Sequence, residues 1–476
     1  MTDPEHEEAS GWVGATAKQM ARAVRRGDAS AGEMVADHLA HIEARESVLR
    51  AFRMVRAAEA LAEADAVDAE EELANMPLAG VPIAVKENTA VAGVPTWNGS
   101  AAARTAVAEA DHEVVRRLRG AGAVVVAVSR EPELGLWAFT DDDEAVTRNP
   151  WRTDRTPGGS SGGAAAAVAA GLVPIAHGND GLGSVRIPAA ACGLVGIKPG
   201  RGVVPCQLGA NDWYGMAEHG ILATTVSDAT VGLAVLAGWT PPQLVEPERL
   251  RVAVSTRSPV SGVRPDAPSR AAVASAAKLL VAAGHDAVER SPRYPTSLGL
   301  RTIATWCAAA YNDAEADKLD AKALQPRSQR HVALGRWAAR HGFVRQEHRD
   351  RWRADCEAWF DRYGVDVLLT PALASSPPVA QQYSSRSWLS NMAASMRFAP
   401  YAAPWNVSGF PAITVPMGVR PDGLPVAIQL VAPPGAELRL LAVAGQLEAA
   451  SPWLRHAPGW PYPSGGADDS PGGAGP

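Results

Sequence analysis

Cysteine is scarce in this sequence of 476 residues. The four cysteines are scattered and form no C-x-x-C pair, which excludes a disulfide-stapled scaffold and a cysteine-based zinc cluster. Such sparse thiols are typical of a reducing compartment, so we expect a cytoplasmic location. The eleven histidines include no H-E-x-x-H motif, and we expect no metal and no other cofactor.

An excess of positive charge and a long apolar run are also missing. The 45 Lys+Arg and 51 Asp+Glu give a net charge of −6, which argues against nucleic acid as a partner. The longest run of small apolar residues, 164–176, is too short to span a bilayer, and the N-terminus is too acidic for a signal peptide. We therefore expect no membrane partner. The oligomeric state is left open between a monomer and a homodimer.

Helix and strand patterns alternate along the chain. Residues 30–33 have capping-box spacing at the start of a helix, and an Ala/Glu-rich helix is predicted over 53–75. Apolar runs predict strands at 81–85 and 124–128, with a helix at 113–119 between them. Further helices are expected at 268–283 and within 301–360, and further strands at 250–254, 365–369, 412–415 and 426–430. This alternation favours an α/β fold with a parallel sheet covered by helices.

The domain organisation is predicted to be simple. Neither an internal repeat nor a clear linker interrupts the chain. We expect one domain over 11–463, a disordered N-terminus at 1–10 and a disordered Gly/Pro/Asp/Ser tail at 464–476.

Three segments carry residues suited to acyl transfer. Lys86 ends an apolar strand, Ser160 lies in the glycine-rich stretch 157–163, and Ser184 follows the small-residue stretch 181–183. A serine hydroxyl becomes a nucleophile when a base takes its proton, and desolvation can lower the pKa of a lysine far enough for it to be that base. Ser160 can relay the proton from Ser184 to Lys86. The backbone N–H groups of Gly181, Leu182 and Gly183 are candidates for an oxyanion hole.

These segments resemble the amidase signature family. Its pattern is a lysine after an apolar strand, then G-G-S-S-G-G, then a G-S-[IV]-R-x-P block that ends in C-G-x-x-G-x-K-P, and the chain has all three in order. The resemblance covers roughly 11–460. It implies an amidase-signature fold with a twisted, mixed, largely parallel sheet sandwiched by helices. It also implies Lys86 as general base, Ser160 as a bridging serine after a cis peptide, and Ser184 as the acylated nucleophile.

The same resemblance suggests supporting and pocket residues. Ser161, Asp180 and Arg186 are expected to support the site, the last two as a buried ion pair that holds the nucleophile loop. His219 is either a pocket residue or a plain loop histidine, and Cys307 is either pocket wall or core. The full set of expected pocket residues is Leu136, Trp137, Trp213, Tyr214, His219, Trp306, Cys307, Trp388 and Trp405. These predict a wide apolar site for an acyl or aryl group.

Some positions depart from the family pattern. Leu182 stands where the family usually has glycine, Glu87 replaces the common Asp, and residues 128–130 (Val-Ser-Arg) replace K-T-N. The nucleophile block is most similar to that of bacterial hydrolases of synthetic amides, nylon-oligomer (6-aminohexanoate cyclic dimer) hydrolases among them. Urethane-cleaving members of the family are a second group that the sequence resembles.

The leading hypothesis is therefore an amidohydrolase that cleaves C–N bonds of small, apolar or aryl amides through a Ser184 acyl-enzyme. Esters and carbamates (urethanes) are further candidate substrates. The alternative is a glutaminase-type subunit of a tRNA-dependent amidotransferase complex, which acts only with a partner. Residues 158–162 also fit the G-x-S-x-G nucleophile elbow, which requires a preceding strand. A glycine-rich loop before a helix could also bind phosphate, but neither G-x-x-x-x-G-K-[ST] nor G-x-G-x-x-G is present.

Overall fold

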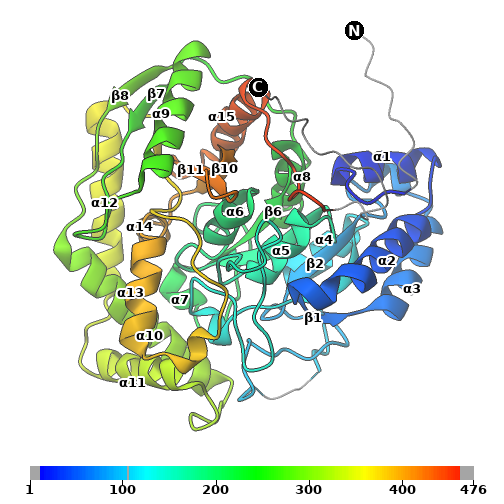
Figure 1. The fold of residues 1–476 in the computed structure, drawn as a ribbon, viewed down its shortest axis with the longest axis horizontal. Coiled ribbons are helices and arrows are strands. Elements are labelled where there is room, and N and C mark those ends of the chain that lie inside the picture. The colour runs from blue at the N-terminus through cyan, green and yellow to red at the C-terminus, as the bar shows by residue number, and fades with distance from the viewer. Residues whose placement is uncertain (1–10, 104–106, 461–476) are drawn as a thin grey trace, which may run out of the picture.

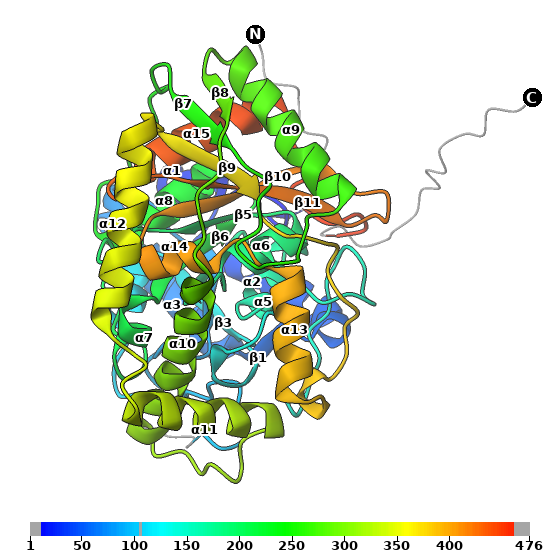
Figure 2. The same ribbon diagram turned by 90° about the vertical axis from the view of Figure 1, so that its left-hand side faces the viewer.

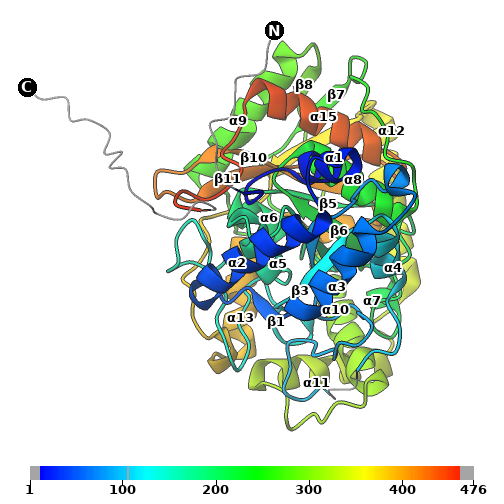
Figure 3. The same ribbon diagram turned by 90° about the vertical axis from the view of Figure 1, so that its right-hand side faces the viewer.

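The structure is a computed structural model that describes residues 11–103 and 107–460. Its centre is an 11-stranded sheet, with helices on both faces (Figures 1 and 3). The strands are β1 (Phe52–Val55), β2 (Pro82–Lys86), β3 (Val124–Ser129), β4 (Ile175–Asp180), β5 (Val195–Lys198), β6 (Glu218–Ala223), β7 (Arg251–Val254), β8 (Asp286–Glu289), β9 (Val367–Pro371), β10 (Ala412–Val419) and β11 (Pro425–Val431). Their order across the sheet is β1-β3-β2-β4-β6-β5-β10-β11-β9-β7-β8.

The described helices fall before, between and after these strands. They are α1 (Ala17–Arg26), α2 (Ala31–Leu49), α3 (Ala57–Asp68), α4 (Glu113–Gly120), α5 (Gly162–Ala169), α6 (Arg186–Cys192), α7 (Asp212–Gly215), α8 (Val226–Ala237), α9 (Ala267–Ala282), α10 (Thr296–Ala316), α11 (Pro326–Arg340), α12 (Gln346–Tyr363), α13 (Trp388–Phe398), α14 (Ala403–Ser408) and α15 (Glu437–Ala450). Short 3-10 turns lie at Leu73–Asn75, Glu133–Gly135 and Tyr383–Ser385. α10 and α13 stand in front of the central strands, and α11, which contacts both, crosses their lower ends (Figure 2).

The α/β architecture and the mixed sheet agree with the prediction. Parallel pairs lie toward the two ends of the sheet, where β2 pairs with β3 and β4, and β7 pairs with β8 and β9. From β4 through β9 the neighbours are antiparallel, as is the edge pair β1–β3. The middle of the sheet is thus less parallel than expected. One reason is that β10 and β11 form a hairpin through residues 420–424, whose Pro-Asp-Gly sequence is a turn signal.

Most predicted elements are present, with shifted boundaries. α2 begins at the predicted capping box, in which the Ser30 side chain accepts from Glu33 N and the Glu33 carboxylate accepts from Ser30 N. The helix predicted over 53–75 is wrong at both ends, because β1 pairs with β3 at its start and α3 covers only Ala57–Asp68. The helical region predicted within 301–360 is divided among α10, α11 and α12.

Two sequence predictions concern the ends of the chain and membrane association. The segments predicted to be disordered, 1–10 and 464–476, lie outside the described residues, as do residues 461–463 of the predicted domain. Among the residues that are described, no helix combines the length and the apolar character that a membrane span requires.

The parallel strands bring the candidate residues to one edge of the sheet. β2, β3 and β4 are buried along their whole length and run in the same direction. Their carboxyl ends therefore meet at one edge, the side on which α/β proteins bind ligands. Lys86 ends β2, Asp180 ends β4, and Glu131 follows the end of β3.

Candidate active site

Lys86 is completely buried, and its amine nitrogen lies among three oxygen atoms. Lys86 Nζ is 2.6 Å from Ser160 Oγ, 2.8 Å from Asn179 Oδ1 and 3.1 Å from Glu131 Oε2. Lys86 and Glu131 are both 0% exposed. Burial lowers the pKa of Lys86, and the Glu131 carboxylate acts in the opposite direction. Burial likewise raises the pKa of Glu131, against the effect of the lysine.

The serine-rich loop packs closely against its neighbours. The Gly159–Ser160 peptide bond is cis, as the family resemblance implied. A Cβ at Gly159 would lie 2.5 Å from the Trp137 carbonyl oxygen, so only glycine allows this approach. Ser161 N–H donates to the Ser184 carbonyl (3.1 Å), and Ser161 Oγ donates to the Asn179 carbonyl (3.3 Å). Ser161 therefore ties the loop to the segment that carries Ser184.

No strand precedes this loop. Residues 150–159 form turns and irregular backbone. The nucleophile-elbow interpretation of residues 158–162 is therefore wrong, since that motif places its serine directly after a strand.

A buried ion pair holds the segment that carries Ser184. Arg186 and Asp180 are 2.9 Å apart and 1% and 0% exposed at their side chains. Arg186 also donates to Asn406 Oδ1 (2.6 Å) and Gln429 Oε1 (2.7 Å). Burial acts to raise the pKa of Asp180, but Arg186 and its hydrogen bonds outweigh burial and leave that pKa below its usual value. The carboxylate is thus ionised, and the pair is the one that the sequence predicted.

The predicted oxyanion residues lie on the tight turn between Asp180 and Ser184. Gly183 has φ +125°, and its N–H donates to Asp180 Oδ1 (2.6 Å). This donor already has a carboxylate partner, so in this structure Gly183 does not offer its N–H as predicted. A Cβ at Gly181 would lie 2.5 Å from the Trp213 ring, so the indole packs directly on this turn. Leu182 projects into the hollow described next.

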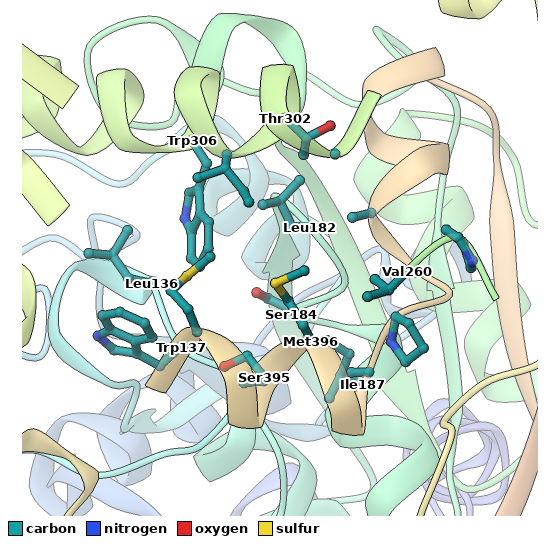
Figure 4. A pocket seen from close by; sticks show the side chains of 18 of the residues that line it. Leu136, Trp137, Leu182, Ser184, Ile187, Val260, Thr302, Trp306, Ser395 and Met396 are labelled. Atoms are coloured by element: carbon teal, nitrogen blue, oxygen red, sulfur yellow. The ribbon is translucent and has the colours of Figure 1, made fainter. Parts of the chain in front are cut away.

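An apolar hollow opens beside Ser184, with about 920 Å³ of empty space including solvent at its mouth. Figure 4 shows Ser184 between α10, which carries Thr302 and Trp306, and α13, which carries Ser395 and Met396. The apolar lining of the hollow includes Leu136, Trp137, Leu182, Ile187, Trp213, Val260, Ile303, Trp306, Met392 and Met396. Such a surface suits an aliphatic or aromatic group.

A second, polar hollow meets the first at Ser184. Ser160 and Ser184 both line it, together with Asn179 from β4. Asp313 from α10 also lines it and accepts from Trp213 Nε1 (2.8 Å). Burial raises the pKa of Asp313 to about 6. Ser184 is thus accessible from an apolar side and from a polar side.

Four of the predicted pocket residues line the apolar hollow, namely Leu136, Trp137, Trp213 and Trp306. Cys307 does not, because a helix turns its side chains by about 100° per residue and the Cys307 backbone packs against Gly335 of α11. Burial also raises the pKa of the Cys307 thiol to about 12.

The other predicted pocket residues point elsewhere. The Tyr214 hydroxyl accepts from Asn312 Nδ2 (2.8 Å), and Trp388 Nε1 donates to His331 Nδ1 (3.0 Å). His219 is buried in β6, with its Nδ1 2.8 Å from His177 Nε2, and burial lowers its pKa to about 3. Trp405 packs against Phe410 in a separate core.

Several polar residues of the site were missed from the sequence. Glu131 and Asn179 contact the Lys86 amine, while Asn406 and Gln429 hold Arg186. The position of Glu131 just after a strand parallel to that of Lys86 is a signal that could have found it. Asn406 and Gln429 are more than two hundred residues from Arg186 in sequence, and no local pattern links them.

No group of three or more His, Cys, Asp or Glu side chains in 11–103 and 107–460 could hold a metal ion.

Comparisons with known proteins give the family and the fold of the chain. The family model Amidase matches residues 33–441. The amidase-type protein AmiB2 of Mycobacterium tuberculosis is 39% identical over 458 residues, which cover 93% of this chain and 98% of that protein. The 6-aminohexanoate-cyclic-dimer hydrolase of Pseudomonas sp. (strain NK87) is 33% identical over 489 residues, covering 94% and 96%. A solved structure of 6-aminohexanoate cyclic dimer hydrolase complexed with substrate has a TM-score of 0.83 at 31% identity, covering 93% and 98%.

Proposed function

The chain belongs to the Amidase family of hydrolases that act on amide C–N bonds, and from that premise we propose that it hydrolyses small apolar or aryl amides through a Ser184 acyl-enzyme. The observation that carries this proposal is the 2.6 Å contact between Lys86 Nζ and Ser160 Oγ, buried beside the apolar hollow that Ser184 lines. A desolvated lysine next to a serine can act as the base that a serine nucleophile without a histidine needs.

The proposed reaction moves one proton along the relay. Ser184 Oγ attacks the amide carbonyl while its proton passes to Ser160, and the proton of Ser160 passes to Lys86. Lys86 then returns a proton through Ser160 to the leaving nitrogen, and the C–N bond breaks. Water cleaves the acyl-enzyme by the same relay, so the enzyme ends in its starting protonation state.

An apolar hollow on one side of Ser184 and a polar hollow on the other suit a substrate that is apolar on one side of the reacting carbonyl. The apolar hollow has a wall of aliphatic, methionine and tryptophan side chains, which would bury an aliphatic chain or an aryl ring. The relative named 6-aminohexanoate-cyclic-dimer hydrolase supports an aliphatic amide, which in that relative's name is a cyclic one, as one candidate. Esters and carbamates present the same carbonyl to Ser184 and are further candidates.

The proposal is tested with two chromogenic substrates that differ beside the carbonyl. Release of nitroaniline is measured from an N-(4-nitrophenyl) acylamide and from the matched N-(4-nitrophenyl) carbamate, with wild type and Ser184→Ala. We expect hydrolysis by the wild type and a loss of at least about a thousandfold in Ser184→Ala. The amide-to-carbamate ratio then ranks the two substrate classes.

Activity that survives in folded Ser184→Ala would refute the nucleophile assignment. Glutamine is included as a third substrate, because preference for glutamine over both anilides would favour the amidotransferase-subunit alternative.

A further inference from the structure

The three partners of the Lys86 amine differ in what they can donate. Asn179 Oδ1 and an ionised Glu131 carboxylate are acceptors only, whereas the Ser160 hydroxyl can also donate its hydrogen. A neutral amine has two N–H groups and one lone pair. One arrangement serves all three partners: the amine donates to Asn179, turns its second N–H toward Glu131 Oε2 at 3.1 Å, and accepts from Ser160. The contacts of 2.6, 2.8 and 3.1 Å therefore define where the lone pair points.

We propose that Glu131 is a positioning residue that, together with Asn179, aims the lone pair of Lys86 at Ser160 and sets the pH at which Lys86 becomes a base. This inference rests on the proposed relay from Ser184 through Ser160 to Lys86.

The Glu131 carboxylate is enclosed by its surroundings. It is 0% exposed, and its backbone N–H donates to Glu87 Oε1 at 2.7 Å. Gly135, which has φ +63°, lies against it, and a Cβ there would be 2.9 Å from Glu131 Oε2 and 3.4 Å from Ser160 Oγ. The carboxylate is therefore shielded from solvent and lies beside Lys86 and Ser160.

The two other carboxyl groups near Lys86, those of Glu87 and Asp180, differ in protonation state. Burial raises the pKa of Glu87 to about 8, so this carboxyl carries its proton at neutral pH. Asp180, at the end of β4, is ionised but paired with Arg186. Its charge is therefore largely neutralised at short range.

The buried imidazoles near Lys86 are uncharged at neutral pH. His177 of β4 and His219 of β6 face each other, and burial lowers the pKa of both. Lys86 is thus subject to two main opposed effects. Burial disfavours its ammonium form, and the Glu131 carboxylate stabilises that form.

The test is the pH dependence of kcat/KM for anilide hydrolysis in wild type and Glu131→Gln. Removal of the anion takes away the largest effect that opposes burial, so the pKa of Lys86 falls and the acid limb moves down by about one to three pH units. The plateau rate also falls by about tenfold, because a glutamine amide can turn its N–H toward the lone pair and misdirect it. If Glu131 had a merely structural role, Glu131→Gln would lower the stability of the fold and leave the acid limb of the pH profile in place.

Glu133 provides a matched control. It is also 0% exposed, but its carboxylate accepts from Ser100 Oγ (2.7 Å) and Gln325 N (2.9 Å). Glu133→Gln therefore keeps the acid limb of the wild type. An unshifted limb in folded Glu131→Gln overturns the proposal, whereas wild-type activity that survives Ser184→Ala overturns the underlying relay instead.

A second measurement serves if Glu131→Gln does not fold. The pairing predicts that Lys86→Met destabilises the wild type more than it destabilises Glu131→Leu, because in the first case it strands a buried carboxylate. Chemical denaturation of the two single variants and the double variant measures this difference. Additive effects would contradict the pairing.

Discussion

Adjacent serines in the glycine-rich loop have different contacts and should respond differently to substitution. Ser160 Oγ contacts Lys86 Nζ, whereas Ser161 Oγ donates to the Asn179 carbonyl. We predict that Ser160→Ala lowers kcat by about 10² to 10⁴, the range of a lost acid–base step. Ser161→Ala should lower it by about tenfold or less, since the backbone N–H of Ser161 still holds Ser184.

This comparison is made by steady-state nitroanilide hydrolysis at the pH optimum. Thermal unfolding of both variants shows that each is folded. Equal losses in the two variants would contradict a relay through Ser160.

At the scale of single residues, the sequence was informative where chemistry depends on residue type. Lys86 and Ser160 stand out because an apolar strand ends in a lysine and a glycine-rich loop carries a serine. Glu131 did not stand out, because a carboxylate after a strand is usually solvated. Its role depends on Glu87 and Gly135, which close the space around it.

The wall of the apolar hollow is built by two helices that are far apart in sequence. α10 contributes Ile303 and Trp306, and α13 contributes Met396. We predict that Met396→Trp narrows the hollow and lowers kcat/KM for long acyl or aryl anilides by about tenfold, with a smaller effect on the acetanilide. The measurement is a series of 4-nitroanilides with increasing acyl length.

A residue on the same helix provides the control for this series. Leu389 of α13 is 71% exposed and is not part of the lining. Leu389→Trp adds the same side chain outside the hollow and should leave the chain-length profile unchanged. A uniform loss over all chain lengths in Met396→Trp would contradict a role in acyl selection.

Helices and strands could be predicted where their sequence signals lie within a few neighbouring residues. The capping box at Ser30 and the apolar runs of β2 and β3 identified their elements directly. The edge strand β1 was missed, because its pairing with β3 overrides the helical propensity of the surrounding Ala/Glu-rich segment. The antiparallel pairing of the central strands could not be predicted from the sequence, because it depends on how the chain connects the strands and not on the residues of any one strand.

On the scale of the whole molecule, one arginine joins the two halves of the chain. Arg186 pairs with Asp180 of β4 and donates to Asn406 of α14 and Gln429 of β11. These contacts tie the segment that carries Ser184 to α14 and to the β10–β11 hairpin, more than two hundred residues later in the sequence. Loss of Arg186 should therefore affect global stability as well as activity.

We predict that Arg186→Leu lowers the free energy of unfolding by about 3 to 5 kcal/mol, because the Asp180 carboxylate is left buried without its cation. Urea unfolding of Arg186→Leu, Asp180→Asn and the double variant measures the coupling. The double variant should be less destabilised than the sum of the single variants, since it contains no unpaired buried charge.

The pH dependence of this stabilisation has a defined sign. In the wild type the folded pKa of Asp180 is lowered, so its contribution is present above the unfolded value of about 3.8 and is lost as the pH falls through the folded value. Without Arg186, the largest effect that opposes burial is lost, and burial outweighs the remaining Lys198 charge and Asn406 hydrogen bond and raises the folded pKa above the unfolded one. The carboxyl then destabilises the protein as the pH rises above about 4, and the wild-type advantage over Arg186→Leu should grow from pH 4 to pH 7. A difference in unfolding free energy that is constant over this range would show that Arg186 acts through packing alone.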